Sequence, residues 1–159
     1  IIRGMPNIFC GVMKSSTAIF SNDKLSKNNK RTIDNLFNLL GVNLWLKKEN
    51  EMNFFTAMFG GGPAYFFYFL NMILKIAKSQ GIPKLKAERL LKNLLAGSLE
   101  FSDQNKLSFS KLISIVTSKG GTTEEAIKYF EKNENFFRLF SKGIEKATSK
   151  SKKISKSLN

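Results

Sequence analysis

Residues 116–125 read VTSKGGTTEE and connect two segments of helical pattern, about 107–116 and 123–132. Thr122 and Glu125 have the spacing of a capping box, which predicts that the second helix begins here. The two glycines let the loop turn its amide N–H groups toward one point, beside the positive end of the helix dipole. Such an arrangement can bind a carboxylate or a phosphate. By itself, however, a glycine-rich helix entrance more often serves only as a cap.

Helical spacing extends over most of the chain. The pattern of residues 11–20 predicts an extended segment. Residues from about 25 to 40 have helical spacing, and Gly41 is the expected end of that helix. Apolar and polar residues alternate over 42–46, which predicts a short strand. After Glu49 we expect only helices and loops. The expected helices are about 50–59, 64–80, 84–99, 107–116, 123–132 and 134–155. The fold class predicted from this pattern is mainly α, with a mixed α/β portion that ends near Glu49.

Composition limits the chemistry that the 159 residues can perform. The chain contains no His, which removes the commonest general base and metal ligand. Cys10 is the only cysteine, so we expect no disulfide framework, no thiolate zinc site and no other metal site. The chain begins with Ile1 and shows no signal-peptide pattern, and we expect it to be a portion of a longer protein.

The net charge of +14 raises nucleic acid or an anionic membrane as a partner. Only four of the 26 basic residues are Arg, so the excess supports phosphate attraction rather than base reading, and solvated lysines explain it more simply. The uncharged run 52–74 is long enough to span a bilayer. Gly60–Pro63 is expected to break that helix in its middle, which favours a buried or interfacial helix pair. We therefore expect neither a nucleic acid nor a membrane as partner, with a basic membrane-associated helical protein as an alternative.

Three ordered blocks of this sequence resemble the pyrroline-5-carboxylate reductase family, the last enzyme of proline biosynthesis. Residues 116–125 resemble its V-T-S-P-G-G-T-T signature, with Lys119 in place of the usual Pro. Residues 3–7, RGMPN, are similar to its R-x-M-P-N segment, and residues 56–65, TAMFGGGPAY, to its T-A-L-S-G-S-G-P-A-Y. Residues 76–83 look like its K-x-G-L-P corner. The resemblance covers essentially the whole chain.

The resemblance implies a division into two parts. In the family a dinucleotide-binding domain precedes the MPN segment, yet this chain has no strand–GxGxxG–helix unit. Residues 1–48 are then the last strands and a helix of a Rossmann-like α/β domain, and residues 49–159 an all-helical substrate-binding and dimerisation domain. The implied protein is cytoplasmic and forms a homodimer or a higher homo-oligomer. The apolar helix 64–74 is expected to build the interface.

The implied reaction is the reduction of 1-pyrroline-5-carboxylate to L-proline by NADPH or NADH. The cofactor would be bound mainly by the missing N-terminal domain, with Met5 and Asn7 near the nicotinamide, so this chain alone is expected to be inactive. A non-catalytic helical dimerisation module is the alternative function.

The resemblance assigns Thr123 as the catalytic residue, with its hydroxyl beside the ring nitrogen of the substrate. The alternative for Thr123 is an ordinary residue at a helix start. Glu49 would hold charge near the substrate, and its alternative is an exposed acid in a turn. The complete set of expected substrate-binding residues is Glu49, Ser118, Gly120, Gly121, Thr122 and Thr123.

Overall fold

The computed structural model describes residues 1–157, and the chain divides into two compact units. Unit 1 contains Ile1–Phe67 together with the segment from Phe140 onward, and unit 2 is Tyr68–Leu139. The described chain is mainly helical with a small sheet near its N-terminus, so the predicted fold class is confirmed. The domain boundary at 48/49 stays a prediction, because the compact units are defined by packing within the chain and not by relationship to the domains of other proteins.

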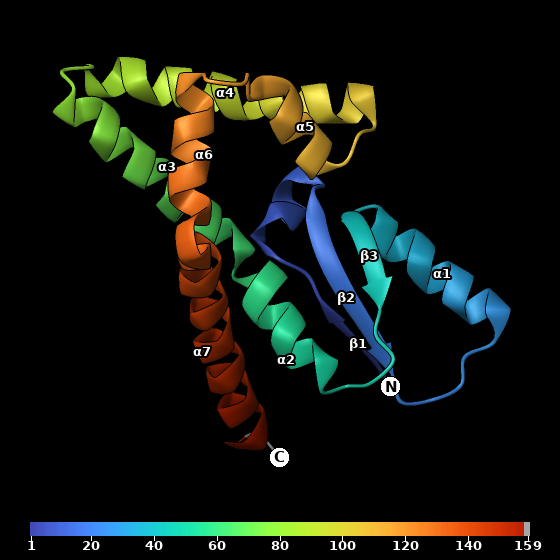
Figure 1. Ribbon diagram of the computed structural model, residues 1–159. Helices are drawn as coiled ribbons and strands as arrows, with labels where there is room; N and C mark the ends of the chain where they lie inside the picture. The colour runs from blue at the N-terminus through green and yellow to red at the C-terminus, as the bar shows by residue number, and fades with distance from the viewer. Residues whose placement is uncertain (158–159) are drawn as a thin grey trace. The chain divides into compact units, whose positions relative to one another are not determined.

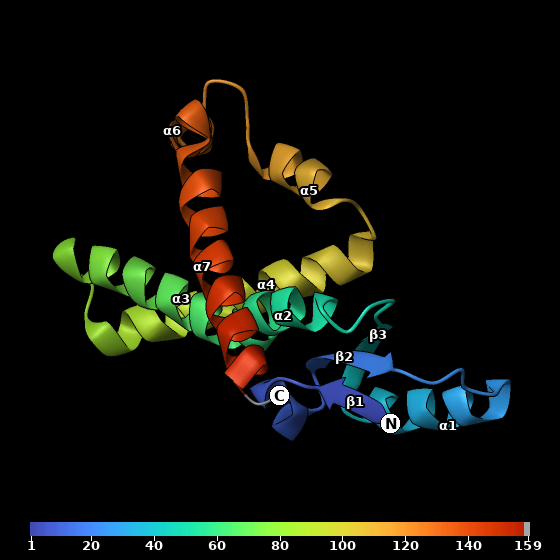
Figure 2. The same cartoon turned by 90° about the horizontal axis from the view of Figure 1, so that it is seen from below.

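Unit 1 contains a three-stranded mixed sheet of order β1-β2-β3 (Figure 1). β1 is antiparallel to β2, whereas β3 is parallel to β2. Helix α1 connects β2 to β3 and lies beside the sheet, as Figure 2 also shows. The bounds of these elements are β1 Ile2–Met5, β2 Ser15–Ser21, α1 Lys27–Asn38 and β3 Gly41–Trp45.

One strand prediction needs correction, and one strand was not predicted. The strand expected over 11–20 begins only at Ser15, because Ile8–Val12 form a 3₁₀-helix, η1. Asn7 caps that turn, since its side-chain oxygen accepts a hydrogen bond from the Phe9 amide at 3.1 Å. Strand β1 has no alternating apolar pattern, so its pairing with β2 is what reveals it.

Gly41 has a different role from the one expected. Helix α1 ends with Leu39 as its cap, and Gly41 is the first residue of β3. Its φ of +142° lies in the region that favours glycine, and a Cβ there would overlap the backbone N and O of Ser15. Glycine is required because the two parallel strands approach each other closely at this pair.

Gly4 allows α1 to pack across the sheet, which gives a stability prediction. A Cβ at Gly4 would lie 2.5 Å from Cζ of Phe37, so Gly4→Ala forces that ring to move. We expect the free energy of unfolding, measured with urea, to fall by about 1–2 kcal/mol. Gly11→Ala is the matched control, because nothing lies within 4 Å of its Cβ position. Equal stability of the two variants would contradict this packing.

The glycine-rich segment after α2 is a milder interruption than expected. Gly61 keeps right-handed helical dihedrals (φ −78°, ψ −14°), and its N–H donates to the Thr56 carbonyl at 2.9 Å, five residues back. The helix therefore widens into a π-turn instead of breaking, and the Gly61 N–H stays paired. The elements here are α2 Glu51–Phe55, the π-segment η2 Thr56–Gly60 and α3 Gly62–Ser79.

Among the described residues, one helical run, Glu51–Ser79, is long and apolar enough to cross a membrane, since it contains an 18-residue stretch with a mean hydropathy of 1.2. A helix that packs in a core or at a subunit interface meets the same criterion. Length and composition therefore do not assign this run to a membrane.

The core of unit 1 lies between the sheet and α2. Ala18 of β2 packs with Met52 and Phe55, all nearly inaccessible to solvent. Helix α7 (Asn135–Ser157) belongs to this unit from Phe140 onward. There the hydroxyls of Ser151 and Ser155 donate to Asn53 Oδ1 at 2.9 and 3.1 Å.

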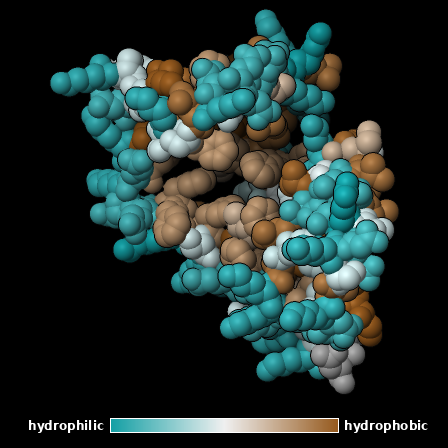
Figure 3. All heavy atoms as spheres, turned by 90° about the vertical axis from the view of Figure 1, so that its right-hand side faces the viewer, coloured by the Kyte–Doolittle hydropathy of each residue, from teal (hydrophilic) through white to brown (hydrophobic). Residues whose placement is uncertain are grey.

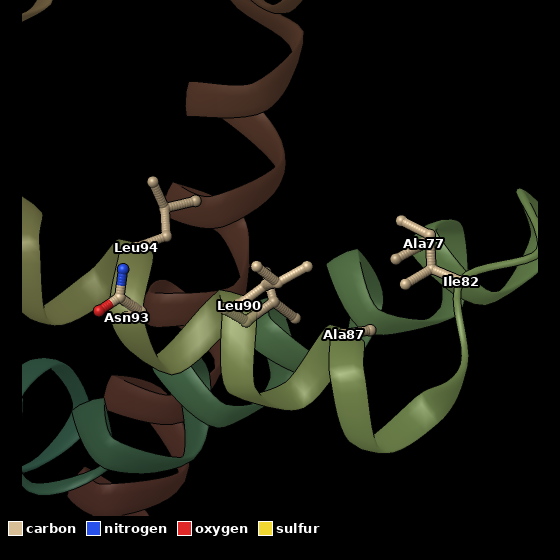
Figure 4. A pocket seen from close by; sticks show the side chains of 7 residues that line it. Ala77, Ile82, Ala87, Leu90, Asn93 and Leu94 are labelled. Carbon is tan, nitrogen blue, oxygen red and sulfur yellow. The ribbon is translucent and has the colours of Figure 1, made fainter.

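Unit 2 consists of helices from the end of α3 to the start of α7. A shallow apolar groove of about 410 Å³ lies between the end of α3 and the first half of α4 (Figure 4). Leu90 and Leu94 of α4 line it and remain more than half exposed. The other helices are α4 Lys84–Asn105, α5 Phe109–Val116 and α6 Thr122–Glu131, followed by the 3₁₀ turn η3 Lys132–Glu134.

Large apolar side chains reach the surface, as the brown areas of Figure 3 show. Four consecutive aromatic residues of α3, Phe66 to Phe69, are exposed. Tyr65 differs from them, because its hydroxyl donates to the Ala57 carbonyl at 2.9 Å and its ring packs edge-on against Phe140. Apolar surface on this scale is typical of a protein–protein or membrane interaction site.

Candidate functional site

The loop between α5 and α6 is built on a tight turn. The Gly121 N–H donates to the Ser118 carbonyl at 3.0 Å, three residues back. Gly120 has φ of +74°, which at the third position of the turn is typical of type II geometry and favours glycine. Lys119 occupies the second position, where the fixed φ of a proline would also fit. The substitution of Lys for the family's Pro thus leaves the turn in place.

Helix α6 starts in a different way from the predicted capping box. Its N-cap is Gly121, which has no side chain to offer, and Thr122 is the first helical residue. The third helical residue is therefore Glu124, not Glu125. Glu124 Oε2 accepts a hydrogen bond from the Gly120 N–H at 2.6 Å, whereas Glu125 pairs with Lys128 at 3.0 Å.

The electrostatics of the turn centre on Glu124. Its hydrogen bond from the Gly120 N–H, together with the nearby Lys128 ammonium, holds the pKa of this carboxyl below its ordinary value of 4.5. The folded loop thus stabilises the ionised form. That contribution is fully present above the ordinary pKa and is lost as the pH falls through the lowered one.

Thr122 and Thr123 present donors that have no partner within residues 1–157. Neither backbone N–H has an acceptor, as is usual in the first turn of a helix, and neither hydroxyl makes a hydrogen bond. Both threonines are exposed, as is Ser118. The structure therefore brings Ser118, Gly120 and the two threonines together around one helix start. This placement gives an anionic group several N–H and O–H donors at the positive end of the α6 dipole.

Gly121 is needed for close packing rather than for an unusual dihedral. A Cβ at this position would lie 2.5 Å from Ser118 Oγ and 3.0 Å from the Ser118 carbonyl oxygen. Any larger residue would push the Ser118 side chain away from the turn.

The remaining expected site residues, Glu49, Met5 and Asn7, belong to unit 1. Glu49 Oε1 lies 3.2 Å from the Arg3 guanidinium, so the RGMPN segment contacts the acid that precedes α2. Both side chains are at least half exposed, and such a pair adds little stability. The contact places a carboxylate beside a permanent cation at the surface.

Met5 and Asn7 have structural contacts of their own. The Asn7 amide Nδ2 donates to the Phe59 carbonyl at 3.1 Å while its oxygen caps η1. Met5 packs against the core cluster of unit 1, and its Cε approaches Gly60. Their proposed place beside a nicotinamide stays a prediction.

A dinucleotide site does not fit the described residues. Within residues 1–157 no glycine-rich turn joins a strand to the N-terminus of a helix, which is the arrangement that binds a pyrophosphate. Within the same residues no group of three or more acidic or Cys side chains could hold a metal ion.

Glu124 is a residue of this loop that the sequence pattern did not single out. The sequence contained a sign of its contact with the Gly120 amide, because an acidic residue at the third position of a helix commonly accepts a hydrogen bond from an amide that precedes the helix. Placing the helix start one residue too late directed that role to Glu125 instead.

Comparison with known proteins supports the resemblance. Residues 49–154 match the family described as pyrroline-5-carboxylate reductase dimerisation. The pyrroline-5-carboxylate reductase of Aquifex aeolicus is 32% identical over 154 residues, which are 97% of this chain and 57% of that protein. That of Pseudomonas aeruginosa is 28% identical over 158 residues, or 99% of this chain and 58% of that protein.

Solved structures of this family have the same fold. The Coxiella burnetii pyrroline-5-carboxylate reductase superposes with a TM-score of 0.89 at 31% identity, over 96% of this chain and 56% of that one. The Plasmodium falciparum pyrroline carboxylate reductase, solved with NADP bound, superposes with a TM-score of 0.82 at 28% identity, over 96% of this chain and 57% of that one. The chain thus spans somewhat more than half the length of the relatives that it matches. Since the family match covers well over half of its residues, the chain belongs to the pyrroline-5-carboxylate reductase family and carries that family's dimerisation region.

Proposed function

We propose that the chain is the substrate-binding and dimerisation portion of a cytoplasmic pyrroline-5-carboxylate reductase, which reduces 1-pyrroline-5-carboxylate to L-proline. One observation carries the proposal. The family signature folds into a turn and helix start where the N–H groups and hydroxyls of Thr122 and Thr123 have no partner within residues 1–157.

The chemistry of the substrate matches this set of donors. Its carboxylate is attached to the carbon next to the ring nitrogen, so adjacent donors can bind both groups at once. The carboxylate would accept hydrogen bonds from the amides at the start of α6, where the helix dipole also favours negative charge. The hydroxyl of Thr123 would then lie beside the ring nitrogen. A threonine hydroxyl is a poor acid, so its contribution is to orient the C=N bond.

The reductant is proposed to be NADPH or NADH, whose nicotinamide supplies a hydride when bound. The Plasmodium falciparum relative was solved with NADP. Because the described residues do not form a dinucleotide site, we propose that this site lies in the part of the relatives that the chain does not span. What this chain contributes is the position of the substrate.

Homo-oligomerisation is indicated by the dimerisation region that the chain carries. The apolar surface of α3 and the groove along α4 are the surfaces that a second copy would cover. We propose that α3 builds much of this interface.

The proposed function can be tested with a chimera. This chain replaces the matching portion of the Pseudomonas aeruginosa reductase, and NADPH oxidation is followed with 1-pyrroline-5-carboxylate as substrate. We expect turnover that is absent from the unmatched portion alone. A chimera that is folded, dimeric and inactive would favour a non-catalytic dimerisation module.

A further inference from the structure

We propose that Glu124 competes with the substrate carboxylate for the Gly120 N–H, so that a residue of this chain lowers the substrate affinity of its own loop. The inference rests on the proposed function, and it concerns how tightly that site binds.

The first observation is that a carboxylate already binds where one is expected. Glu124 Oε2 accepts from the Gly120 N–H at 2.6 Å, a short, charge-assisted hydrogen bond. The substrate presents the same chemical group. A donor engaged with one carboxylate is unavailable to another, and two carboxylates at one helix start repel each other.

The second observation is that the other donors of the loop are unequally available. The Gly121 N–H closes the turn through its bond to the Ser118 carbonyl, so it stays engaged. The N–H groups of Thr122 and Thr123 have no acceptor within the part of the chain described. The Gly120 N–H differs from these three amides, because its availability depends on the position of a flexible side chain.

The third observation is that Glu124 has a second partner. Its Oε1 lies 3.4 Å from the Lys128 ammonium, one helical turn further on. A Glu124 side chain that leaves Gly120 thus keeps an opposite charge beside it. When a substrate carboxylate displaces Glu124 from Gly120, Glu124 loses one hydrogen bond but is not left as an isolated charge. The displacement is therefore reversible.

A purely structural role for Glu124 predicts the opposite effect. If the bond to Gly120 serves only to hold the turn, its loss loosens the loop and weakens substrate binding. Competition predicts that its loss tightens binding. The sign of the change in affinity therefore separates the two roles.

The experiment uses the whole chain labelled with ¹⁵N and titrated with L-proline, the product that shares the carboxylate. We expect Glu124→Ala to bind L-proline about three- to tenfold more tightly than the unchanged chain, since one competing hydrogen bond is gone. Glu124→Gln keeps an acceptor without the charge and should fall in between. The Gly120 amide signal should shift in both variants, while the other amides keep their folded positions.

Glu125→Ala is the matched control. It removes a neighbouring carboxylate that pairs with Lys128 but makes no bond to Gly120. Its affinity for L-proline should equal that of the unchanged chain. Equal or weaker binding by Glu124→Ala would overturn the competition and leave the proposed function intact. Failure of all four proteins to bind L-proline would instead refute the substrate site itself, and the competition with it.

Discussion

Thr123→Val should lower kcat/KM for 1-pyrroline-5-carboxylate by about ten- to a hundredfold in the chimera that contains this chain. The factor corresponds to about 1.4–2.7 kcal/mol of lost transition-state stabilisation. Valine keeps the shape of the side chain and the backbone N–H, so only the hydrogen bond to the ring nitrogen is removed. Binding of L-proline should weaken much less, because the donors to its carboxylate remain.

The Thr123→Val substitution should leave the fold of the loop undisturbed. Thr123 is exposed at the second position of α6 and its hydroxyl has no partner within residues 1–157, so its loss breaks no contact of the fold there. Thr32, Thr117 and Thr148 differ, since each donates to a carbonyl four residues earlier in its helix. A residue at a helix start has no such acceptor.

Thr122→Val is the matched control, because it removes an exposed hydroxyl from the preceding residue. Thr122 is expected to act through its amide, so kcat/KM should change less than for Thr123→Val. Unchanged turnover of a folded Thr123→Val variant would show that Thr123 is an ordinary residue at a helix start.

Phe69→Asp should dissociate the proposed dimer of this chain, with the dissociation constant raised more than a hundredfold. Phe69, Met72 and Ile76 follow an i, i+3, i+7 pattern along α3 and are 43%, 39% and 58% exposed. In a two-fold dimer the substitution occurs twice. Each copy loses an apolar contact of about 2 kcal/mol and places a charge in an apolar interface, so the total exceeds the roughly 2.7 kcal/mol that a hundredfold change requires.

Asn71→Asp is the control for the added charge. Asn71 is exposed two residues further along α3, roughly on the opposite side of the helix from Phe69. Sedimentation velocity at micromolar concentration should show a monomer for Phe69→Asp and a dimer for both Asn71→Asp and the unchanged chain. A stable, well-behaved monomer of the unchanged chain would refute the interface.

The helical part of the fold could be predicted from local pattern because the apolar residues of each helix recur at helical spacing in the sequence. The helix expected over 123–132 is observed at Thr122–Glu131, and the one over 107–116 at Phe109–Val116. Helix α4 continues to Asn105, past the expected end at 99, since nothing within that stretch prevents the backbone hydrogen bonds from continuing. The family assignment from three ordered motifs was also confirmed by the match over residues 49–154.

By itself, the sequence determined the fold class, the family and the loop at residues 118–123, because these depend on periodicity and on residues that are close together in the chain. Tertiary structure decided the rest. Strand β1 exists through its pairing with β2, Gly41 is needed because Ser15 lies against it, and Glu49 meets Arg3 from 46 residues away. Even within the loop, the choice of Glu124 over Glu125 depended on the residue at which the helix begins. A shift of one residue turns a side chain by about 100° around the axis, which moves its carboxylate either onto the Gly120 amide or away from it.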